Sequence, residues 1–252
     1  MKDTISNYFF IKELNKGKHS ERIDVVKNKF DNQLYILKMI ENDKNNKNIE
    51  REKEIMNILG NDNHPNIMKY YSYFFENNCH CFILEFINGV DLEDFSEQFK
   101  ANNQYIHQNI IIKIFKGLIN GLVYLSQKNI LHRDISLDNI MIDNNNNIKI
   151  IDFGLSRFNQ ENTEKTIVGK KFYISPEIYK KFKKKNGDNK YAQYDFNIDV
   201  FSLGVAMFYL MTYKYPFFLN SQKEYYRNEH YIDPNKYNEQ LIDIVMSMFG
   251  NR

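Results

Sequence analysis

The feature of this sequence that most limits its fold is a set of polar residues spaced around a short predicted hairpin. His132-Arg133-Asp134 and Asn139 precede the hairpin, and Asp152-Phe153-Gly154 begins thirteen residues after Asn139. The interval contains two β-rich runs, at 140–142 and 148–151, around a polar turn at 143–147. Two strands and a tight turn fit this gap, so Asn139 and Asp152 can face the same metal site.

Length and charge narrow the class of protein. The chain has 252 residues, enough for one large domain or for two lobes that share a cleft. Hydrophobic residues make up 42% and the aromatic residues include 20 Phe and 18 Tyr, so a sizeable core can form. A formal net charge of +2 is too small to favour nucleic acid or a membrane surface as a partner.

The two cysteines and the apolar runs bear on the compartment. Cys79 and Cys81 flank His80, but a zinc site needs four ligands, so two free thiols in a reducing cytosol are the favoured interpretation. The N-terminus shows no signal peptide pattern. The longest apolar run, about 200–211, is too short to span a bilayer and indicates a buried helix. We therefore expect a soluble, cytoplasmic protein.

Patterning along the chain predicts a β-rich part followed by a helical part. Strands are expected within 8–40, at 67–75 and at 81–86, with a helix over 45–59 between them. After Gly89 the pattern changes to a long amphipathic helix over 104–128, and the chain is expected to be mostly helical from about 199. The expected fold class is α+β, with a small β-rich lobe containing one main helix and a larger, mainly helical lobe.

His132-Arg133-Asp134, Asn139 and Asp152-Phe153-Gly154, followed by Ser175-Pro176-Glu177, together resemble the eukaryotic protein kinase family over nearly the whole chain. The resemblance implies a bilobal domain with an N-lobe at 1–84, a hinge at 85–89 and a C-lobe at 90–252. It implies ATP and Mg²⁺ as cofactors and transfer of the γ-phosphoryl group to Ser/Thr hydroxyls of a protein substrate. A pseudokinase that binds nucleotide or acts as a scaffold, and a small-molecule kinase of related fold, are the alternatives.

The resemblance assigns catalytic roles position by position. Asp134 is expected to orient the substrate hydroxyl or accept its proton, and Asn139 and Asp152 are the expected Mg²⁺ ligands. Lys38 is expected to hold the α- and β-phosphates. Because a lysine in an apolar strand is costly to bury without a partner, a glutamate on the next helix should pair with it. Glu54 is preferred over Glu50 for this pairing.

The nucleotide site combines expected contacts with departures from the family. Leu84 would be the gatekeeper, backbone groups of Glu85 and Ile87 would bond adenine, and Asp91 lies where a ribose contact is expected. The phosphate-covering loop keeps only one glycine of the family pattern, and Ile36 is bulkier than the usual alanine. The residues expected around ATP are Asn15, Gly17, Ser20, Ile23, Ile36, Lys38, Leu84, Glu85, Ile87, Asp91 and Met141.

Two further departures lie near the predicted catalytic aspartate. Ser136 replaces the lysine that Ser/Thr kinases carry two residues after it, and Asp138 stands where tyrosine kinases carry an arginine. Lys170 takes the place of a threonine that normally contacts this aspartate. One hypothesis is that Lys170 supplies the missing ammonium group to Asp134. The alternative is that Lys170 faces solvent.

The remaining family positions concern regulation and support. Arg133 is expected to pair with a phosphate on the activation segment, with Thr166 as the expected phosphosite, Thr163 as the second choice and an upstream activating kinase as a possible partner. Asp199 is expected to anchor the backbone of the catalytic loop. Glu177 normally pairs with an arginine near the end of the domain, for which Arg252 is the candidate, so the C-lobe is expected to be short at that end.

Overall fold

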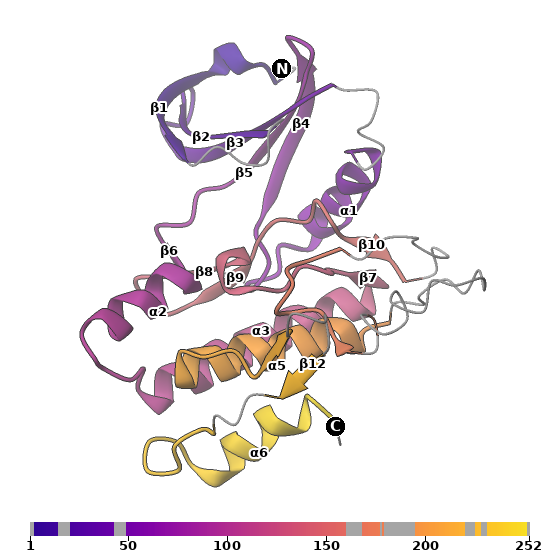
Figure 1. The fold of residues 1–252 in the computed structure, drawn as a ribbon. Helices are drawn as coiled ribbons and strands as arrows, with labels where there is room; N and C mark the ends of the chain where they lie inside the picture. The colour runs from indigo at the N-terminus through magenta and orange to yellow at the C-terminus, as the bar shows by residue number, and fades with distance from the viewer. Residues whose placement is uncertain are drawn as a thin grey trace, which may run out of the picture. The chain divides into compact units, whose positions relative to one another are not determined.

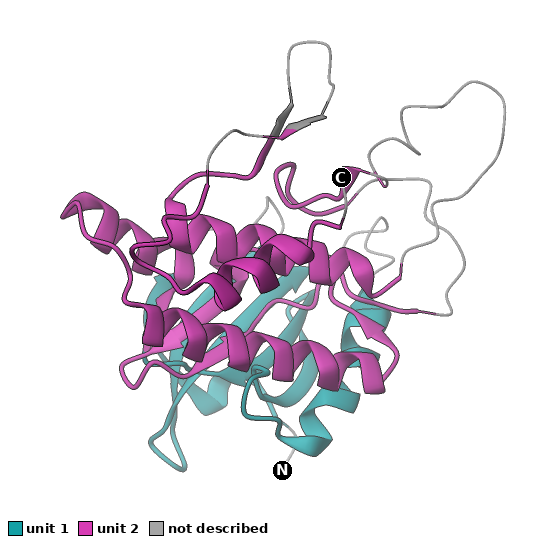
Figure 2. Ribbon diagram, turned by 90° about the horizontal axis from the view of Figure 1, so that it is seen from below, with its two compact units in different colours: residues 1–88 teal, residues 89–252 magenta. Residues whose placement is uncertain are grey.

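A computed structural model gives the fold of the chain (Figure 1). The structure describes residues 3–14, 21–42, 49–159, 168–176, 178, 195–219, 225–227 and 231–250. The chain divides into two compact units, residues 1–88 and 89–252, which are coloured separately in Figure 2. The boundary falls within the segment 85–89 that was expected as a hinge.

Unit 1 contains a five-stranded antiparallel sheet and one main helix. The strand order is β1-β2-β3-β5-β4. After the short 3-10 helix Ile5–Asn7, the elements are β1 (Tyr8–Leu14), β2 (Glu21–Asn28), β3 (Leu34–Glu41), α1 (Ile49–Asp62), β4 (Tyr70–Glu76) and β5 (Cys79–Glu85).

The two faces of this sheet have different roles. Side chains alternate between faces along each strand, so the cross-strand register assigns each residue to a face. One face carries a buried hydrophobic cluster of Tyr8, Val26, Leu37, Phe74, Cys81 and Ile83. The opposite face carries Lys38 and its cross-strand neighbours Ile23 and Phe82. A one-residue slip in register would exchange the two sets.

Unit 2 is mainly helical, with several short strands. Its regular elements are β6 (Gly89–Asp91), α2 (Leu92–Ala101), α3 (Gln108–Gln127), β7 (Ile130–Leu131), a 3-10 turn (Leu137–Asn139), β8 (Ile140–Asp143), β9 (Ile148–Ile150), β10 (Arg157–Phe158), α5 (Asn197–Thr212), β11 (Phe217–Leu219), β12 (Tyr225–Arg227) and α6 (Glu239–Ser247). The strands form a β6-β8-β9 sheet and the pairs β10-β7 and β11-β12.

Helices α3 and α5 form the centre of unit 2, where they contact each other and lie side by side in Figure 1. Residues of α5 are buried on all sides, among them Phe201, whose ring contacts those of Phe217 and Phe249 at centroid distances of 5.5 and 5.7 Å. A helix that is apolar all round is expected to lie within a core. Helix α3 is long and apolar enough to cross a membrane by length and composition. Its contacts with β7, β9 and α5 are those of a core helix.

Strand β6 requires a glycine where it begins. Gly89 lies opposite Asp143 of β8, and a Cβ placed on Gly89 would come within 2.0 Å of the carbonyl oxygen of Ile142. Only a residue without a side chain can approach the neighbouring strand so closely. Gly89 therefore sets the packing of β6 on β8 at the first residue of unit 2.

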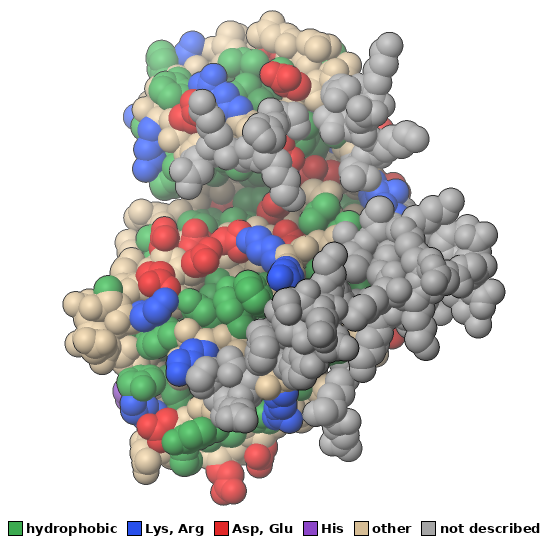
Figure 3. Space-filling model, in the orientation of Figure 1, with side chains coloured by type: hydrophobic (Ala, Val, Ile, Leu, Met, Phe, Trp, Pro, Cys, Tyr) green, Lys and Arg blue, Asp and Glu red, His purple; other side chains and the backbone are tan. Residues whose placement is uncertain are grey.

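The fold confirms the expected α+β class. Two of its elements differ from the elements expected from the sequence. The sequence pattern did not predict α2, although Asp91 caps its N-terminus by accepting a hydrogen bond from Asp94 N at 2.8 Å. The β11-β12 hairpin lies in a part that was expected to be mostly helical. The surface of unit 2 in Figure 3 carries acidic and basic side chains close together, in keeping with a small net charge.

Candidate active site

The predicted phosphate-binding lysine forms a buried ion pair in unit 1. Lys38 Nζ lies 2.8 Å from Glu52 Oε1, and each side chain is 7% exposed. Lys38 comes from β3, in a run of apolar residues, and Glu52 comes from α1. The pairing compensates two charges that would each be costly to bury alone.

The expected partner Glu54 is wrong, and so is the alternative Glu50. Both side chains are exposed, whereas Glu52 is buried. Glu52 lies three residues after Ile49 and three before Ile55, so it is part of the apolar stripe that α1 turns inward. That i, i+3 spacing was visible in the sequence and would have identified Glu52.

The residues expected around adenine in unit 1 share one face of the sheet. Ile23 lies opposite Lys38, and Ile36 lies opposite Leu84. Since Ile36 and Lys38 are two residues apart on β3, all four side chains project from the same face. The backbone N–H of Glu85 donates to Lys69 O at 2.9 Å. Ile87 follows β5 and is partly buried.

In unit 2 the predicted hairpin forms and joins two of the site residues. Strands β8 and β9 pair antiparallel, and Ile151 N donates to the carbonyl oxygen of Asn139 at 2.9 Å. Asp152 is the next residue along the chain, so the hairpin brings it beside Asn139. Asp152 has a φ of +58°, and its Oδ1 accepts a hydrogen bond from Gly154 N at 3.2 Å.

The Asn139 side chain is oriented by Asp134. Asn139 Nδ2 donates to the backbone oxygen of Asp134 at 2.8 Å and to Asp134 Oδ2 at 2.9 Å. Because both acceptors are oxygens, the amide nitrogen must face Asp134. The Asn139 amide oxygen is left to bind another group, and an amide oxygen is a ligand that Mg²⁺ accepts.

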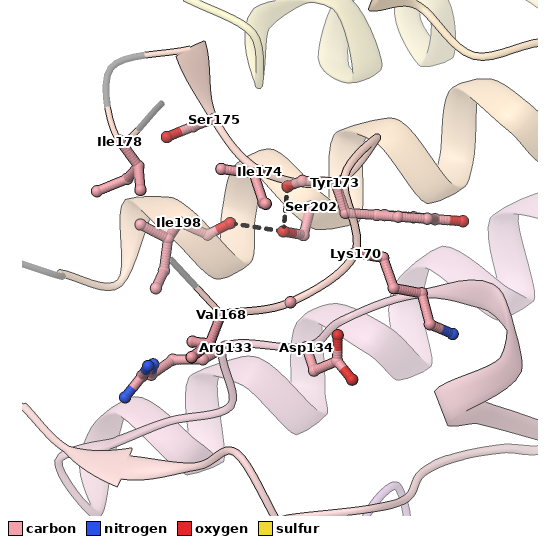
Figure 4. Close-up of a pocket in the computed structure, with 11 residues that line it drawn as sticks. Arg133, Asp134, Val168, Lys170, Tyr173, Ile174, Ser175, Ile178, Ile198 and Ser202 are labelled. Atoms are coloured by element: carbon pink, nitrogen blue, oxygen red, sulfur yellow. Dashed lines mark hydrogen bonds between the residues drawn. The ribbon is translucent and has the colours of Figure 1, made fainter. Parts of the chain in front are cut away.

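The other oxygen of the Asp134 carboxylate is buried and accepts no hydrogen bond from the described residues. Buried carboxylate oxygens are normally hydrogen-bonded. Asp134 Oδ1 therefore has acceptor capacity of the kind that a hydroxyl proton can use. In Figure 4 the Arg133 and Asp134 side chains leave the chain in opposite directions, and Arg133 has a φ of +69°.

Asp199 anchors the catalytic loop from α5, which confirms the expected role. Its carboxylate accepts hydrogen bonds from the backbone N–H groups of His132 and Arg133, each at 2.8 Å. The side chain is 3% exposed, and burial raises the pKa of the Asp199 carboxyl above its usual value, although the two N–H donors and His132 oppose that shift. The loop that carries Asp134 is thereby fixed to the central helix.

His132 supports the same loop from its side chain. His132 Nε2 hydrogen-bonds Ile151 O at 3.0 Å, and Asp134 N donates to His132 Nδ1 at 3.3 Å. These contacts need a proton on Nε2 and a lone pair on Nδ1. The imidazole also packs edge-on against Phe153, with centroids 5.1 Å apart. His132 thus joins the segments before Asp134 and around Asp152.

Met141 and Asp91, the two nucleotide contacts expected in unit 2, are cross-strand neighbours of β8 and β6. Asp91 Oδ1 is used as the N-cap of α2. Burial raises the pKa of the Asp91 carboxyl, with the nearby Asp94 and Asp138 charges adding to the shift and backbone donors opposing it.

Lys170 does not supply an ammonium group to Asp134. It forms an ion pair with Asp138 Oδ2, so the Asp134 hypothesis is wrong, whereas the side chain is 42% exposed, in keeping with the solvent-facing alternative. Asp138 Oδ1 accepts a hydrogen bond from Ser136 Oγ at 2.8 Å.

Several predictions lie outside the residues that the structure describes. They concern the phosphate-covering loop, the phosphosites of the activation segment, and the ion pair expected at the end of the domain. The residues are Asn15, Gly17, Ser20, Thr163, Thr166, Glu177 and Arg252.

The residues present suit Mg²⁺ better than a transition metal. No group of three or more His, Cys, Asp or Glu side chains suited to a metal occurs in the described part of the chain, which includes Cys79, His80 and Cys81. Asn139 and Asp152 offer one amide and one carboxylate. Mg²⁺ is commonly bound by one or two protein groups together with phosphates and water.

Comparison with known proteins identifies the family. Residues 8–249 match the family model described as the protein kinase domain. The chain therefore belongs to the protein kinase family. In fold, it resembles the kinase PK-1 of Cydia pomonella granulovirus, with a TM-score of 0.79 and 21% identity, covering 98% of this chain and 89% of that one.

Curated relatives are serine/threonine and related protein kinases. The chain is 31% identical over 246 residues to an Aurora kinase of Saccharomyces cerevisiae, covering 94% of this chain and 62% of that one. It is 29% identical over 224 residues to mitogen-activated protein kinase kinase 2 of Arabidopsis thaliana, covering 88% and 58%. For the probable serine/threonine-protein kinase nek3 of Dictyostelium discoideum the identity is 31% over 220 residues, covering 84% and 19%. The chain thus spans less than two thirds of the length of these relatives.

Proposed function

We propose that this chain is a Mg·ATP-dependent protein kinase that phosphorylates serine or threonine hydroxyls of protein substrates. The observation that carries the proposal is the orientation of Asn139. Its amide nitrogen is fixed on Asp134 by two hydrogen bonds, at 2.8 and 2.9 Å, so its oxygen is available to a metal. The same contacts hold the Asp134 carboxylate beside that oxygen, as transfer to a hydroxyl requires.

Each residue has a definite role in the proposed reaction. Bound Mg·ATP supplies the phosphoryl group and part of the neutralising charge. Asn139 and Asp152 bind the metal through oxygen atoms, and the Lys38 ammonium, held by Glu52, binds phosphate oxygens. Asp134 orients the substrate hydroxyl and receives its proton as transfer proceeds.

The nucleotide-contacting residues support the same proposal. Ile23, Ile36 and Leu84 form an apolar face next to Lys38, suited to a purine ring. The backbone groups of Glu85 and Ile87 in unit 1, and Met141 in unit 2, are the other residues that we propose to contact adenine. Selectivity for Ser/Thr is supported by the Ser/Thr kinases among the relatives, although the sequence has Ser136 where such kinases carry lysine.

Transfer from γ-labelled ATP to a generic protein substrate tests the proposal. The wild type should transfer phosphate in the presence of Mg²⁺, and Asp134→Asn should lower the rate at least about a hundredfold, the usual contribution of a positioned base. Asp94→Asn makes the same chemical change at an exposed residue of unit 2 and should transfer at the wild-type rate.

A second measurement separates catalysis from binding. Thermal unfolding with ATP, with and without Mg²⁺, reports nucleotide binding because a ligand that binds only the folded state raises the melting temperature. Stabilisation by Mg·ATP without any transfer by the wild type would replace the proposed activity by that of a nucleotide-binding pseudokinase.

A further inference from the structure

Two departures of this chain from the family meet at a single carboxylate. The hydroxyl of Ser136, which is fully buried, donates to Asp138 Oδ1 at 2.8 Å. The ammonium group of Lys170 pairs with Asp138 Oδ2. Asp138 directly precedes Asn139, so its side chain links the catalytic loop to the segment that contains Lys170.

The residue before Lys170 lies against the predicted catalytic aspartate. Gly169 has a φ of +91°, and a Cβ placed on it would lie 2.8 Å from the carbonyl oxygen of Arg133 and 3.6 Å from Asp134 Oδ1. The glycine backbone is therefore one wall beside the Asp134 carboxylate, and a larger residue would be strained there. Figure 4 shows Asp134 next to the segment that joins Val168 to Lys170.

The same segment is held at its other end by α5. Ser202 Oγ donates to the carbonyl oxygen of Tyr173 at 2.9 Å, and Figure 4 marks this bond. The Phe172 ring stacks on Tyr215 with centroids 4.4 Å apart. Tyr173 N closes a turn on Lys170 O at 2.9 Å. Gly169 lies on the far side of Lys170 from these contacts, so its position depends on what holds Lys170.

We propose that Lys170 and Asp138 are positioning residues for phosphoryl transfer, because their ion pair holds Gly169 against Asp134. The inference rests on the proposed function. The pair acts through the Gly169 backbone, which limits the directions in which the Asp134 carboxylate can turn. It provides a tie between the catalytic loop and the activation segment in a chain that has Ser136 in place of the usual lysine.

The exposure of the pair sets the size of the expected effect. The Lys170 and Asp138 side chains are 42% and 35% exposed, so solvent screens their attraction. Reversing one charge also adds repulsion. We expect Lys170→Glu to lower kcat/KM for the protein substrate by about fivefold to tenfold, of which loss of the exposed pair accounts for at most about fivefold and the added repulsion for the rest. The KM for ATP should stay within about twofold, because neither residue is expected to contact the nucleotide.

A charge exchange tests the pairing directly. Lys170→Glu and Asp138→Lys should each lower kcat/KM, and the double variant Lys170→Glu/Asp138→Lys should recover to within about threefold of the wild type, because interacting sites are not additive. Lys171→Glu is the matched control, since it makes the same change at the exposed neighbouring residue. Additive losses in the double variant, or an equal loss in Lys171→Glu, would refute the proposal.

Amide hydrogen exchange gives a readout that does not need turnover. Exchange over residues 168–173 should be faster in Lys170→Glu and in Asp138→Lys than in the wild type, and unchanged in Lys171→Glu. Unchanged exchange in all variants would overturn the inference even in an active kinase. A wild type that transfers no phosphate would instead reject the proposed function, and exchange would still decide whether the pair holds the segment.

Discussion

Replacement of Glu52 tests the buried ion pair most directly. The Lys38 and Glu52 side chains are each 7% exposed, with 2.8 Å between Nζ and Oε1. Glu52→Gln keeps the shape and one hydrogen-bond acceptor but removes the charge that compensates the lysine. Breaking a buried pair costs about 3–5 kcal/mol, and the retained acceptor places this variant near about 3 kcal/mol. Glu54→Gln, at an exposed position, should change the stability by less than about 0.5 kcal/mol.

Thermal unfolding followed by circular dichroism measures this difference. For a chain of 252 residues, a loss of about 3 kcal/mol corresponds to a fall of about 6–12 °C in Tm. Glu52→Gln should show this fall, and Glu54→Gln should melt within about 2 °C of the wild type. Equal melting temperatures for the two variants, or a larger fall for Glu54→Gln, would refute the pairing of Lys38 with Glu52.

The double variant Lys38→Met/Glu52→Leu separates stability from activity. Replacing both partners of a buried ion pair by apolar residues is often neutral or stabilising. The double variant should therefore melt above Glu52→Gln and near the wild type, yet transfer no phosphate because no ammonium group remains at position 38. Retained transfer in this variant would show that the lysine has no role at the phosphates.

Three further predictions follow from described contacts. Gly89→Ala should lower the free energy of unfolding in urea by about 1–3 kcal/mol, because the added methyl group would overlap the carbonyl oxygen of Ile142. An unchanged unfolding midpoint would contradict the close approach of β6 to β8 at Gly89. Burial raises the pKa of the Cys81 thiol to about 12, so at pH 8 only about one Cys81 side chain in ten thousand is a thiolate. A thiol reagent should therefore label Cys79 before Cys81, and equal labelling rates for the two cysteines would contradict the burial of Cys81. The raised pKa of Asp199 means that the folded state binds the extra proton, so the free energy of unfolding should fall as the pH rises from about 4 through that pKa. Asp199→Asn should lack this part of the pH dependence. Identical profiles of unfolding free energy against pH for the variant and the wild type would count against a raised pKa of Asp199.

The sequence predicted the parts of the site that depend on local order. Asn139 and Asp152 are separated by a hairpin whose strands and turn follow from β-rich runs and a polar turn, so their proximity needed only local information. Lys38 was identified from the family resemblance, and its place in an apolar run of β3 indicated that it needed a partner. Its partner was not found, because the prediction compared only Glu50 and Glu54 and overlooked the i, i+3 spacing that places Glu52 between Ile49 and Ile55.

The β11-β12 hairpin and the role of Asp138 were missed for different reasons. The paired strands of the hairpin, Phe217–Leu219 and Tyr225–Arg227, are only three residues long, too short to show an alternating pattern. The role of Asp138 could not be predicted either, because the partner Lys170 lies 32 residues away in an irregular segment. An ion pair between two loops has no periodicity that a sequence can display.

The turn between β8 and β9 has a consequence for engineering this chain. Asp143 stabilises this turn, because its Oδ1 accepts hydrogen bonds from Asn145 N at 2.9 Å and from Asn147 N at 2.8 Å. The residues of the turn are mostly exposed. The strands on either side fix Asn139 next to residue 151, so the ends of any longer loop would still meet at the same place. The tip near Asn145 is therefore a permissive insertion point, where a reporter domain could be placed without altering the spacing of Asn139 and Asp152.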